Sequence, residues 1–213
     1  MTERIRFHFD PICPWCYQTS RWLKRLAELG EVELTWGLFS LEAQNAGAEP
    51  EDLAKAHSRS KRALATAIAV RDEAGSDGLG AFYSALGTRV HEHGEALDDP
   101  DTVKCALDDA DLDPGLMDRA AADPAYADRV ALEHRALVER TRSFGVPTLV
   151  LDGGDGPAIF GPVISEPPAT DAEAVELLRH VVWLARHPSF AELKRERDRL
   201  PDLESVRRWS RSS

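Results

Sequence analysis

Two cysteines at the junction of a predicted strand and a predicted helix constrain this chain more than any other feature. Residues 4–9 alternate between apolar and polar side chains, which is the period of a strand. The CPWC sequence at residues 13–16 follows, and apolar residues then recur at helical spacing up to Gly30, which favours a helix end. Residues 31–39 alternate again. This part of the chain therefore predicts strand, helix and strand, with a CxxC motif where the helix begins.

The rest of the chain separates into a helical part and a second strand-containing part. Residues 51–143 show helical spacing and almost no strand signal, and much of this stretch is acidic. Strand signals return at residues 144–162, where a glycine-rich turn predicts a hairpin. Residues 171–186 again carry apolar side chains at helical spacing, and we expect a short helix within residues 190–213.

This order of elements predicts an α/β protein with a thioredoxin fold, β-α-β followed by β-β-α, and an all-helical insertion. We assign residues 1–45 and 144–213 to the thioredoxin-like domain and residues 46–143 to the inserted helical domain. The chain is long enough to bury a core without disulfide bonds.

The CxxC motif suits thiol–disulfide chemistry because of its place in the fold. Cys13 is expected at a helix N-terminus, where unpaired N–H groups and the helix dipole stabilise a thiolate. Pro14 fits the first helical position, where an N–H has no partner. Cys16 lies one turn further on and can displace a mixed disulfide from Cys13. We predict that Cys13 is the exposed nucleophile and Cys16 the more buried resolving thiol.

Two other interpretations of the cysteine pair stay open. A structural zinc site needs four nitrogen or sulfur ligands, and only Cys105 remains to join the pair. The pair could also be two inert core thiols. We favour redox chemistry and predict no metal site. Cys105 lies between Val103 and Leu107 in a helical stretch, and we expect it to be a buried structural thiol.

A second candidate segment is Val146-Pro147-Thr148, at the start of a predicted strand. In a thioredoxin order of elements, a cis bond before Pro147 would lie opposite the CxxC motif. It would leave the backbone of Val146 free to hydrogen-bond an extended substrate. We therefore name Val146, Pro147 and Thr148 as candidate substrate-binding residues, together with Pro14 and Trp15, whose ring is expected to face solvent or substrate.

Two histidines and a tyrosine are weaker candidates. His91 follows the apolar stripe of residues 79–90, and it could line a cleft between the insertion and the thioredoxin-like domain or lie on the surface. We include His91 among the candidate substrate-binding residues. His134 and Tyr83 are expected to be mainly structural.

Composition excludes several classes of function. The chain carries 37 acidic and 26 basic residues, a formal net charge of −11. Such a surface disfavours sequence-independent binding to nucleic acids and to anionic membranes. The three cysteines are too few for a disulfide framework. The first ten residues include charged side chains at positions 3, 4, 6 and 10, and no long apolar run follows. We therefore expect a cytoplasmic protein with no membrane or nucleic-acid partner.

Several stretches in order along nearly the whole chain resemble the DsbA-like branch of the thioredoxin superfamily, and more closely the actinobacterial mycothiol-dependent nitroreductase family. The resemblance is carried by residues 9–16 (FDPICPWC), 19–22 (TSRW), 87–91 (GTRVH), 145–148 (GVPT), 160–163 (FGPV) and 190–195 (FAELKR). It implies a cytoplasmic reductase with Cys13 as the nucleophile and Cys16 as its partner. It further implies mycothiol as the thiol co-substrate, no tightly bound cofactor, and a helical insertion that acts as a lid over the dithiol.

Other functions remain open at this stage. A DsbA-like protein disulfide oxidase or isomerase would use the same CxxC motif. A relative of the kappa-class glutathione transferases or of 2-hydroxychromene-2-carboxylate isomerase would bind a thiol without dithiol exchange, although such relatives often have serine at the position of Cys13. We expect small-molecule or disulfide substrates, and either a monomer or a homodimer.

Overall fold

The structure is a computed structural model, and it describes residues 2–212 of the chain. In chain order its elements are β1 (Glu3–Phe9), α1 (Pro14–Glu28), β2 (Val32–Leu38), α2 (Leu41–Asn45), α3 (Glu51–Ser58), α4 (Lys61–Gly87), the π-helical turn η1 (Thr88–Glu92), α5 (Pro100–Asp109), α6 (Gly115–Ala122), α7 (Ala125–Thr141), β3 (Thr148–Leu151), the 3₁₀ turn η2 (Asp152–Gly154), β4 (Ala158–Phe160), α8 (Asp171–Arg186) and α9 (Glu204–Ser212).

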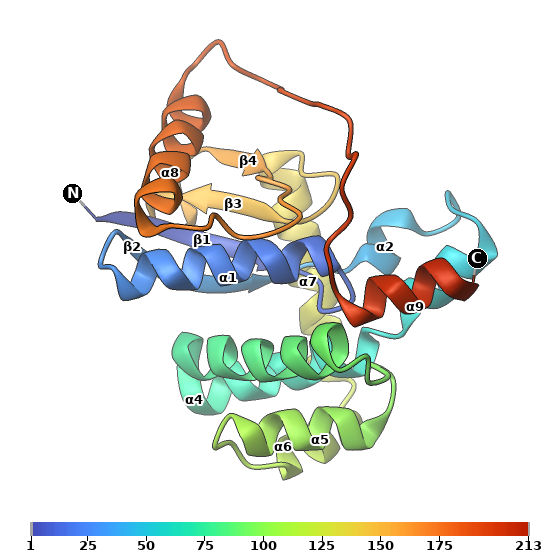
Figure 1. Ribbon diagram of the computed structural model, residues 1–213. Coiled ribbons are helices and arrows are strands. Elements are labelled where there is room, and N and C mark those ends of the chain that lie inside the picture. The colour runs from blue at the N-terminus through green and yellow to red at the C-terminus, as the bar shows by residue number, and fades with distance from the viewer. Residues whose placement is uncertain (1, 213) are drawn as a thin grey trace.

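Four strands form one sheet in the order β2-β1-β3-β4. Strand β2 runs parallel to β1, whereas β3 is antiparallel to β1 and β4 is antiparallel to β3. Phe7 in the central strand pairs with Trp36 on one side and with Leu149 on the other. With α1 between the two parallel strands and α8 after the hairpin, this is the thioredoxin fold that the sequence predicts. Helices α2 to α7 are inserted between β2 and β3 (Figure 1).

Local capping signals fix the ends of the helices that frame the sheet. Cys13 caps the N-terminus of α1, and Gly30 ends the helix with a φ of 74° that favours glycine. The Thr170 hydroxyl accepts a hydrogen bond from Glu173 N, while the Glu173 carboxylate accepts one from Thr170 N. This capping box starts α8 at Asp171, so the helix predicted over residues 171–186 is confirmed.

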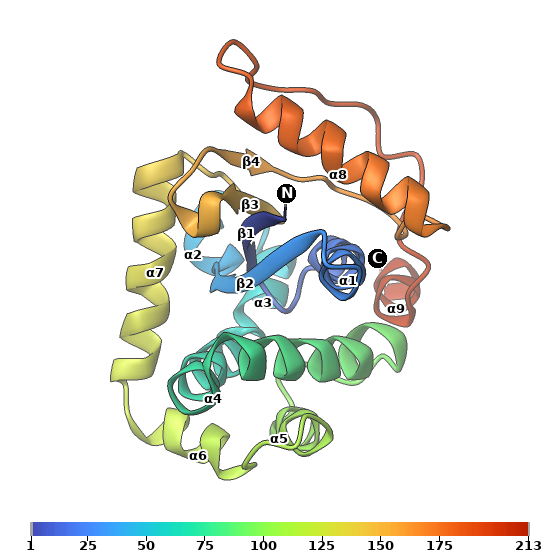
Figure 2. The same ribbon diagram turned by 90° about the vertical axis from the view of Figure 1, so that its left-hand side faces the viewer.

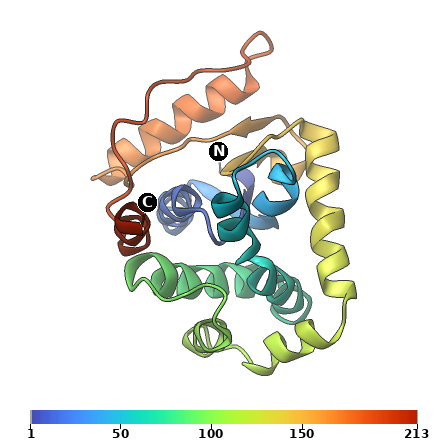
Figure 3. The same cartoon turned by 90° about the vertical axis from the view of Figure 1, so that its right-hand side faces the viewer.

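Helices surround the sheet on several sides. Figures 2 and 3 show the strands at the centre, α8 on one side, α4 with α5 and α6 on the opposite side, and α7 running between the two. The long helix α4 is kinked at Gly75, where φ is 69°. Among residues 2–212, none of the helices has the length and apolar character needed to cross a membrane.

A cluster of aromatic rings joins α4 to the sheet. The Tyr83 ring stacks on Phe9 with 3.7 Å between ring centroids and meets Trp36 edge-on at 5.6 Å. Gly80 allows this approach, because a Cβ atom there would lie 2.4 Å from Nε1 of Trp36. The inserted helices are therefore packed against the sheet through α4 by a tightly fitted ring contact.

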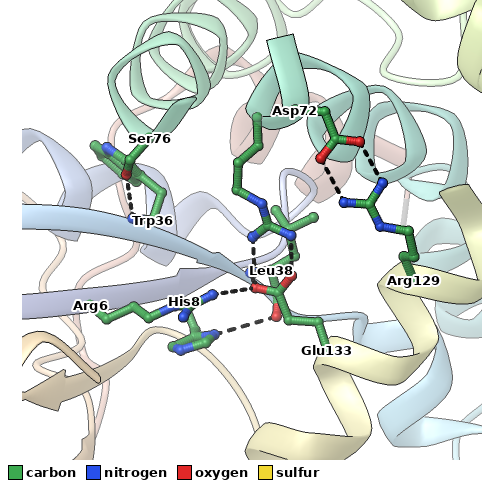
Figure 4. Close-up of polar contacts among 9 residues, drawn as sticks. Arg6, His8, Trp36, Leu38, Asp72, Ser76, Arg129 and Glu133 are labelled. Atoms are coloured by element: carbon green, nitrogen blue, oxygen red, sulfur yellow. Dashed lines mark hydrogen bonds and ion pairs between the residues drawn. The ribbon is translucent and has the colours of Figure 1, made fainter. Parts of the chain in front are cut away.

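A partly buried carboxylate joins α7 to the same sheet (Figure 4). Glu133 accepts hydrogen bonds from the Arg6 guanidinium at 3.0 Å, from both terminal nitrogens of Arg71 at 3.0 and 2.6 Å, and from Leu38 N at 2.9 Å. Burial acts to raise the pKa of Glu133, but the hydrogen bonds and charge of Arg71, the hydrogen bond from Leu38 N and the charge of Arg6 together outweigh it, so that the pKa lies below its usual value. The ionised carboxylate thus connects β1, β2, α4 and α7.

His8 lies beside this cluster and depends on a glycine. Its Nδ1 is 3.4 Å from the Leu38 carbonyl oxygen, and its ring lies against Gly37. A Cβ atom at Gly37 would be 2.3 to 2.8 Å from three atoms of the ring. Burial lowers the pKa of His8 to about 4, so the ring is neutral near neutral pH.

From the end of α8 the chain crosses the molecule as an extended segment, residues 187–203, which we call the C-terminal strap. Figure 1 shows it passing from α8 to α9. Residues 191–200 are all exposed, whereas Leu203 at the far end is only 4% exposed. The short helix predicted within residues 190–213 is α9, and it follows the strap.

The prediction of a buried structural thiol at Cys105 is wrong, because this thiol is exposed. Helix α5 buries Val103, Ala106 and Leu107. Residues two apart on a helix point in different directions, so the apolar neighbours at 103 and 107 do not bring Cys105 to the same face.

Candidate active site

The CPWC sequence forms the N-terminus of α1. Cys13 has extended backbone angles, and its Sγ accepts a hydrogen bond from Cys16 N at 3.4 Å. Pro14 occupies the first helical turn, as predicted. Sulfur is thereby placed where a side-chain oxygen would normally cap a helix, and a thiolate there meets the N–H groups of the first turn.

The two thiols are placed in different electrostatic surroundings. The hydrogen bond from the Cys16 side chain is the main reason why the pKa of Cys13 is lowered, and the backbone N–H groups of Cys16 and Trp15 act in the same direction. Burial raises the pKa of Cys16 well above its usual value, and a charge on Cys13 raises it further. The pair can therefore hold one thiolate, on Cys13, with the proton kept on Cys16.

The expected difference in burial is present, but Cys13 is less accessible than we predicted. Cys13 is 7% exposed and Cys16 is fully buried. The prediction that Cys13 is exposed is therefore wrong, although Cys13 is more accessible than Cys16. The loop before β3 covers Cys13, with Sγ 3.9 Å from the Val146 carbonyl oxygen. A neutral Cys13 thiol donates toward this oxygen.

The loop before β3 meets the cysteine pair as the sequence suggested. The Val146–Pro147 peptide bond is cis, and the Gly161–Pro162 bond is cis as well. Thr148 is fully buried and its hydroxyl donates to the Gly145 carbonyl oxygen at 2.8 Å. The loop thus presents backbone groups of Val146 to the site, whereas the Thr148 side chain is used within the loop itself.

Asp10, at the end of β1, is a site residue that the sequence reasoning missed. Its buried carboxylate accepts hydrogen bonds from Ile12 N at 3.1 Å, Leu41 N at 2.8 Å and the Ser60 hydroxyl at 3.3 Å. Burial raises the pKa of Asp10 to about 6, although these hydrogen bonds act to lower it. A charge on Asp10 in turn opposes ionisation of both thiols. The available signal was an acidic residue directly before the CxxC turn.

His91 lies inside the protein, which corrects both placements considered from the sequence. The side chain is 1% exposed and neither lines an open cleft nor lies on the surface. Its Nε2 is 3.0 Å from the Pro11 carbonyl oxygen and its Nδ1 is 2.9 Å from the Ser205 hydroxyl. Since a carbonyl only accepts, Nε2 carries the proton and Nδ1 accepts from Ser205.

This pair of hydrogen bonds connects the C-terminal helix to the loop that carries the cysteines. Burial lowers the pKa of His91 to about 4, so the neutral ring is retained near neutral pH. The ring also stacks on Tyr17 of α1 with 5.2 Å between centroids. With both ring nitrogens occupied, His91 has no hydrogen-bonding group left for a ligand and acts by positioning the loop.

His134 and Tyr83 have the structural surroundings that we expected for them. Nδ1 of His134 accepts a hydrogen bond from Ser40 N at 3.4 Å, and its ring packs edge-on against Phe39. Tyr83 belongs to the ring cluster between α4 and the sheet. Burial raises the pKa of the Tyr83 hydroxyl well above its usual value, so it stays protonated.

A cavity lies beside Trp15, the residue between Pro14 and Cys16, and neither cysteine lines it. Its volume is about 1130 Å³, and Trp15 forms part of its wall. The remaining wall comes from residues 141–144, β4 and the loop to residue 166, α8, and the C-terminal strap. The partly buried Trp15 ring packs against the core on one side. The ring also lines the cavity, where the guanidinium carbon of Arg197 lies 5.6 Å from the ring centre.

Within residues 2–212, no group of three or more His, Cys, Asp or Glu side chains is arranged to hold a metal ion. The site thus consists of two thiols with unequal pKa values and a neighbouring cis-proline loop, with a cavity beside Trp15. This arrangement can exchange a disulfide bond between the protein and a second molecule.

Comparison with known proteins gives two kinds of relative. The model of the family described as "Rv2466c-like: Mycothiol-dependent nitroreductase Rv2466c" matches residues 12–195. The "Uncharacterized protein Rv2286c" of Mycobacterium tuberculosis is 34% identical over 192 residues, which covers 90% of this chain and 81% of that protein.

Solved structures with lower identity share the fold. The cytosolic disulfide reductase DsbM from Pseudomonas aeruginosa superposes with a TM-score of 0.58 at 15% identity, covering 84% of this chain and 99% of DsbM. The oxidised form of Mtb DsbA gives a TM-score of 0.52 at 17% identity, covering 87% of this chain and 84% of that protein. At these identities the likeness concerns the fold alone.

Proposed function

Since the chain belongs to the Rv2466c-like family of mycothiol-dependent nitroreductases and is thereby a thiol-dependent oxidoreductase, we propose that it is a cytoplasmic reductase that uses mycothiol. Its substrates are small electrophilic or disulfide compounds, and no cofactor is tightly bound. The observation that carries the proposal is the unequal pair at the start of α1, with the pKa of Cys13 lowered and that of Cys16 raised.

The reaction with a disulfide follows from this inequality. The Cys13 thiolate attacks one sulfur of the substrate, forms a mixed disulfide and expels the first thiolate. Cys16 then gives up its proton and attacks Sγ of Cys13, which expels the second thiolate. Two electrons pass from the protein dithiol to the substrate, and both product thiolates can take up protons. Two mycothiol molecules then reduce the protein disulfide and leave as mycothiol disulfide.

Groups around the cysteines have separate roles in this proposal. The backbone of Val146, held by the cis bond to Pro147, pairs with the substrate beside Cys13, and Thr148 stabilises this loop. Pro14 and Trp15 form the surface next to the nucleophile. His91 belongs to the positioning groups and does not contact the substrate, because both of its ring nitrogens are occupied.

The function is tested by following the dithiol through one cycle. The reduced protein should become oxidised at Cys13 and Cys16 when it is mixed with a small disulfide, and Cys13→Ser should abolish this reaction. Cys16→Ser should instead accumulate the mixed disulfide on Cys13, which mass spectrometry detects. Mycothiol should restore the dithiol faster than either glutathione or NADPH with thioredoxin reductase. Full turnover by the Cys13→Ser variant would contradict the mechanism.

The reduction potential separates a reductase from an oxidase. A reductase should lie near the thioredoxin value of about −270 mV, whereas a DsbA-like oxidase should lie near about −120 mV. Equilibration of the Cys13–Cys16 pair in redox buffers, read out by trapping free thiols, measures it. A reduction potential near that of DsbA would show that the protein is an oxidase and would contradict the proposed reductase.

We also propose that residues 46–143 act as a lid on the thioredoxin-like part, residues 1–45 and 144–213. The hydrogen bond from Ser60 to Asp10 supports this, because it connects the insertion to the residue beneath the cysteine loop. Amide hydrogen exchange in residues 51–143 should therefore differ between oxidised and reduced protein. Equal protection in the two forms would count against the lid.

A further inference from the structure

The cavity beside Trp15 is covered by a segment whose side chains are mostly exposed. The C-terminal strap crosses it, and residues 191–200 are all exposed. Both ends of the strap are held, by α8 on one side and by the buried Leu203 and the Ser205 contact to His91 on the other. The cavity of about 1130 Å³ is therefore not filled by the strap and is large enough for a small organic molecule.

Several aromatic rings line the walls of this cavity. Trp15 lies between the two cysteines in sequence, and Phe144 lies two residues before Val146, whose carbonyl oxygen is near Cys13. The ring of Phe144 is 62% exposed and meets Phe160 at 4.6 Å between centroids. Phe190 adds a ring from the start of the strap. Planar ligands are favoured by such surroundings.

One strap arginine places a positive charge over the ring next to the nucleophile. The guanidinium carbon of Arg197 lies 5.6 Å from the centre of the Trp15 ring. Within residues 2–212, no carboxylate lies within ion-pairing distance of Arg197, whereas Arg195 pairs with Asp198 and Arg199 pairs with Glu166. The charge of Arg197 is thus available to an anionic group bound in the cavity.

From this arrangement we propose that the strap-covered cavity binds small aromatic substrates that carry an anionic group, and that Arg197 determines this specificity. The inference rests on the proposed function, in which Cys13 is the nucleophile. The aromatic part of the substrate lies against Trp15 and Phe144, and its anionic group lies near the Arg197 guanidinium. Trp15 lies between Cys13 and Cys16 in the sequence, so the electrophilic atom is on the Trp15 side of the cavity.

The proposal is tested with four disulfides that separate ring and charge. The anionic aromatic disulfide is 5,5′-dithiobis(2-nitrobenzoate), and the neutral aromatic one is 4,4′-dithiodipyridine. The anionic aliphatic disulfide is 3,3′-dithiodipropionate, and the neutral aliphatic one is bis(2-hydroxyethyl) disulfide. Stopped-flow rates of the reduced protein are divided by those of N-acetylcysteine thiolate, because the four disulfides differ in intrinsic reactivity. With each disulfide the protein gives up two electrons, forms the Cys13–Cys16 disulfide and releases two thiol products.

The normalised rate should be highest for the anionic aromatic disulfide. Arg197→Met should lower that rate by about two- to fivefold and leave both neutral disulfides unchanged. Trp15→Leu should lower the rates of both aromatic disulfides by about two- to tenfold relative to the aliphatic ones. Added salt should reduce the rate difference between the wild type and Arg197→Met, because the charge of the exposed Arg197 is screened.

Arg179→Met is the matched control. Arg179 is exposed on α8, does not line this cavity, and its loss changes the net charge by the same amount. It should leave all four rates unchanged. The neutral disulfides report on folding and on the cysteines in every variant.

The outcomes distinguish the inference from the function on which it rests. If no disulfide oxidises Cys13 and Cys16, the proposed function fails. If all four react but their normalised rates are equal, or if Arg197→Met and Arg179→Met have the same effect, the function stands and the specificity proposal is overturned.

Discussion

Replacing Asp10 by Asn should remove a component of stability that decreases as the pH rises. The pKa of Asp10 is raised by burial from 3.8 to about 6. Between these values the folded protein holds a proton that the unfolded chain has released, so this group favours folding most below about pH 4. The advantage is lost as the pH rises through about 6. The difference between the two pKa values corresponds to about 3 kcal/mol.

Urea unfolding of both proteins from about pH 4 to about pH 7 measures this effect. Cys13 and Cys16 are replaced by Ser in both, so that thiol ionisation does not contribute. Asn at position 10 offers poorer acceptors to Ile12 N and Leu41 N, but this cost does not depend on pH. The free-energy difference between the two proteins should change by about 2 kcal/mol over the range, in favour of the Asn variant at high pH, because part of the full difference develops below about pH 4. A difference that stays constant would refute the reasoning.

Three further substitutions test the packing around the site. Glu133→Gln should cost about 2 kcal/mol in urea unfolding, because it leaves two arginines without their partly buried carboxylate. The same carboxylate has a lowered pKa, so its contribution should be lost as the pH falls through that value. Gly37→Ala should lower the midpoint of thermal unfolding and cost about 2 kcal/mol, because the added methyl group overlaps the His8 ring. An unchanged midpoint would show that the His8 ring can move aside without cost. Ser205→Ala should cost about 1 kcal/mol in free energy of unfolding and speed amide exchange in α9, because it removes the donor to His91. Exchange at the wild-type rate would show that this hydrogen bond does not hold α9 in place.

The parts of the fold that the sequence predicted are those set by local rules. The alternation in residues 4–9 and 31–39, the proline after Cys13 and the glycine at position 30 each specify geometry within a few residues. The order of these elements then leaves few topologies, because a parallel strand pair needs a crossover such as α1. The cysteine pair and the Val146–Pro147 bond could be placed in this way.

The features that were missed depend on contacts between distant parts of the chain. His91 is buried only because Ser205 and Pro11 meet on its two ring nitrogens. Asp10 is enclosed by groups from α2 and from the start of α4, and its position before the CxxC turn does not reveal which groups enclose it. Arg197 reaches Trp15 through an extended strap that has no periodic pattern. Such pairings are set by tertiary packing, which spacing along one sequence does not encode.

The cover over the cysteines has a consequence for how the protein is made. Cys13 and Cys16 leave the ribosome early, whereas Val146 and Ser205, which close and fix their surroundings, are among the later residues. A growing chain therefore carries this pair without its cover for most of synthesis. The nascent chain is therefore the stage at which oxidants reach both sulfurs most easily, and folding of the loop before β3 onto Cys13 is what limits further oxidation to sulfinic and sulfonic acids.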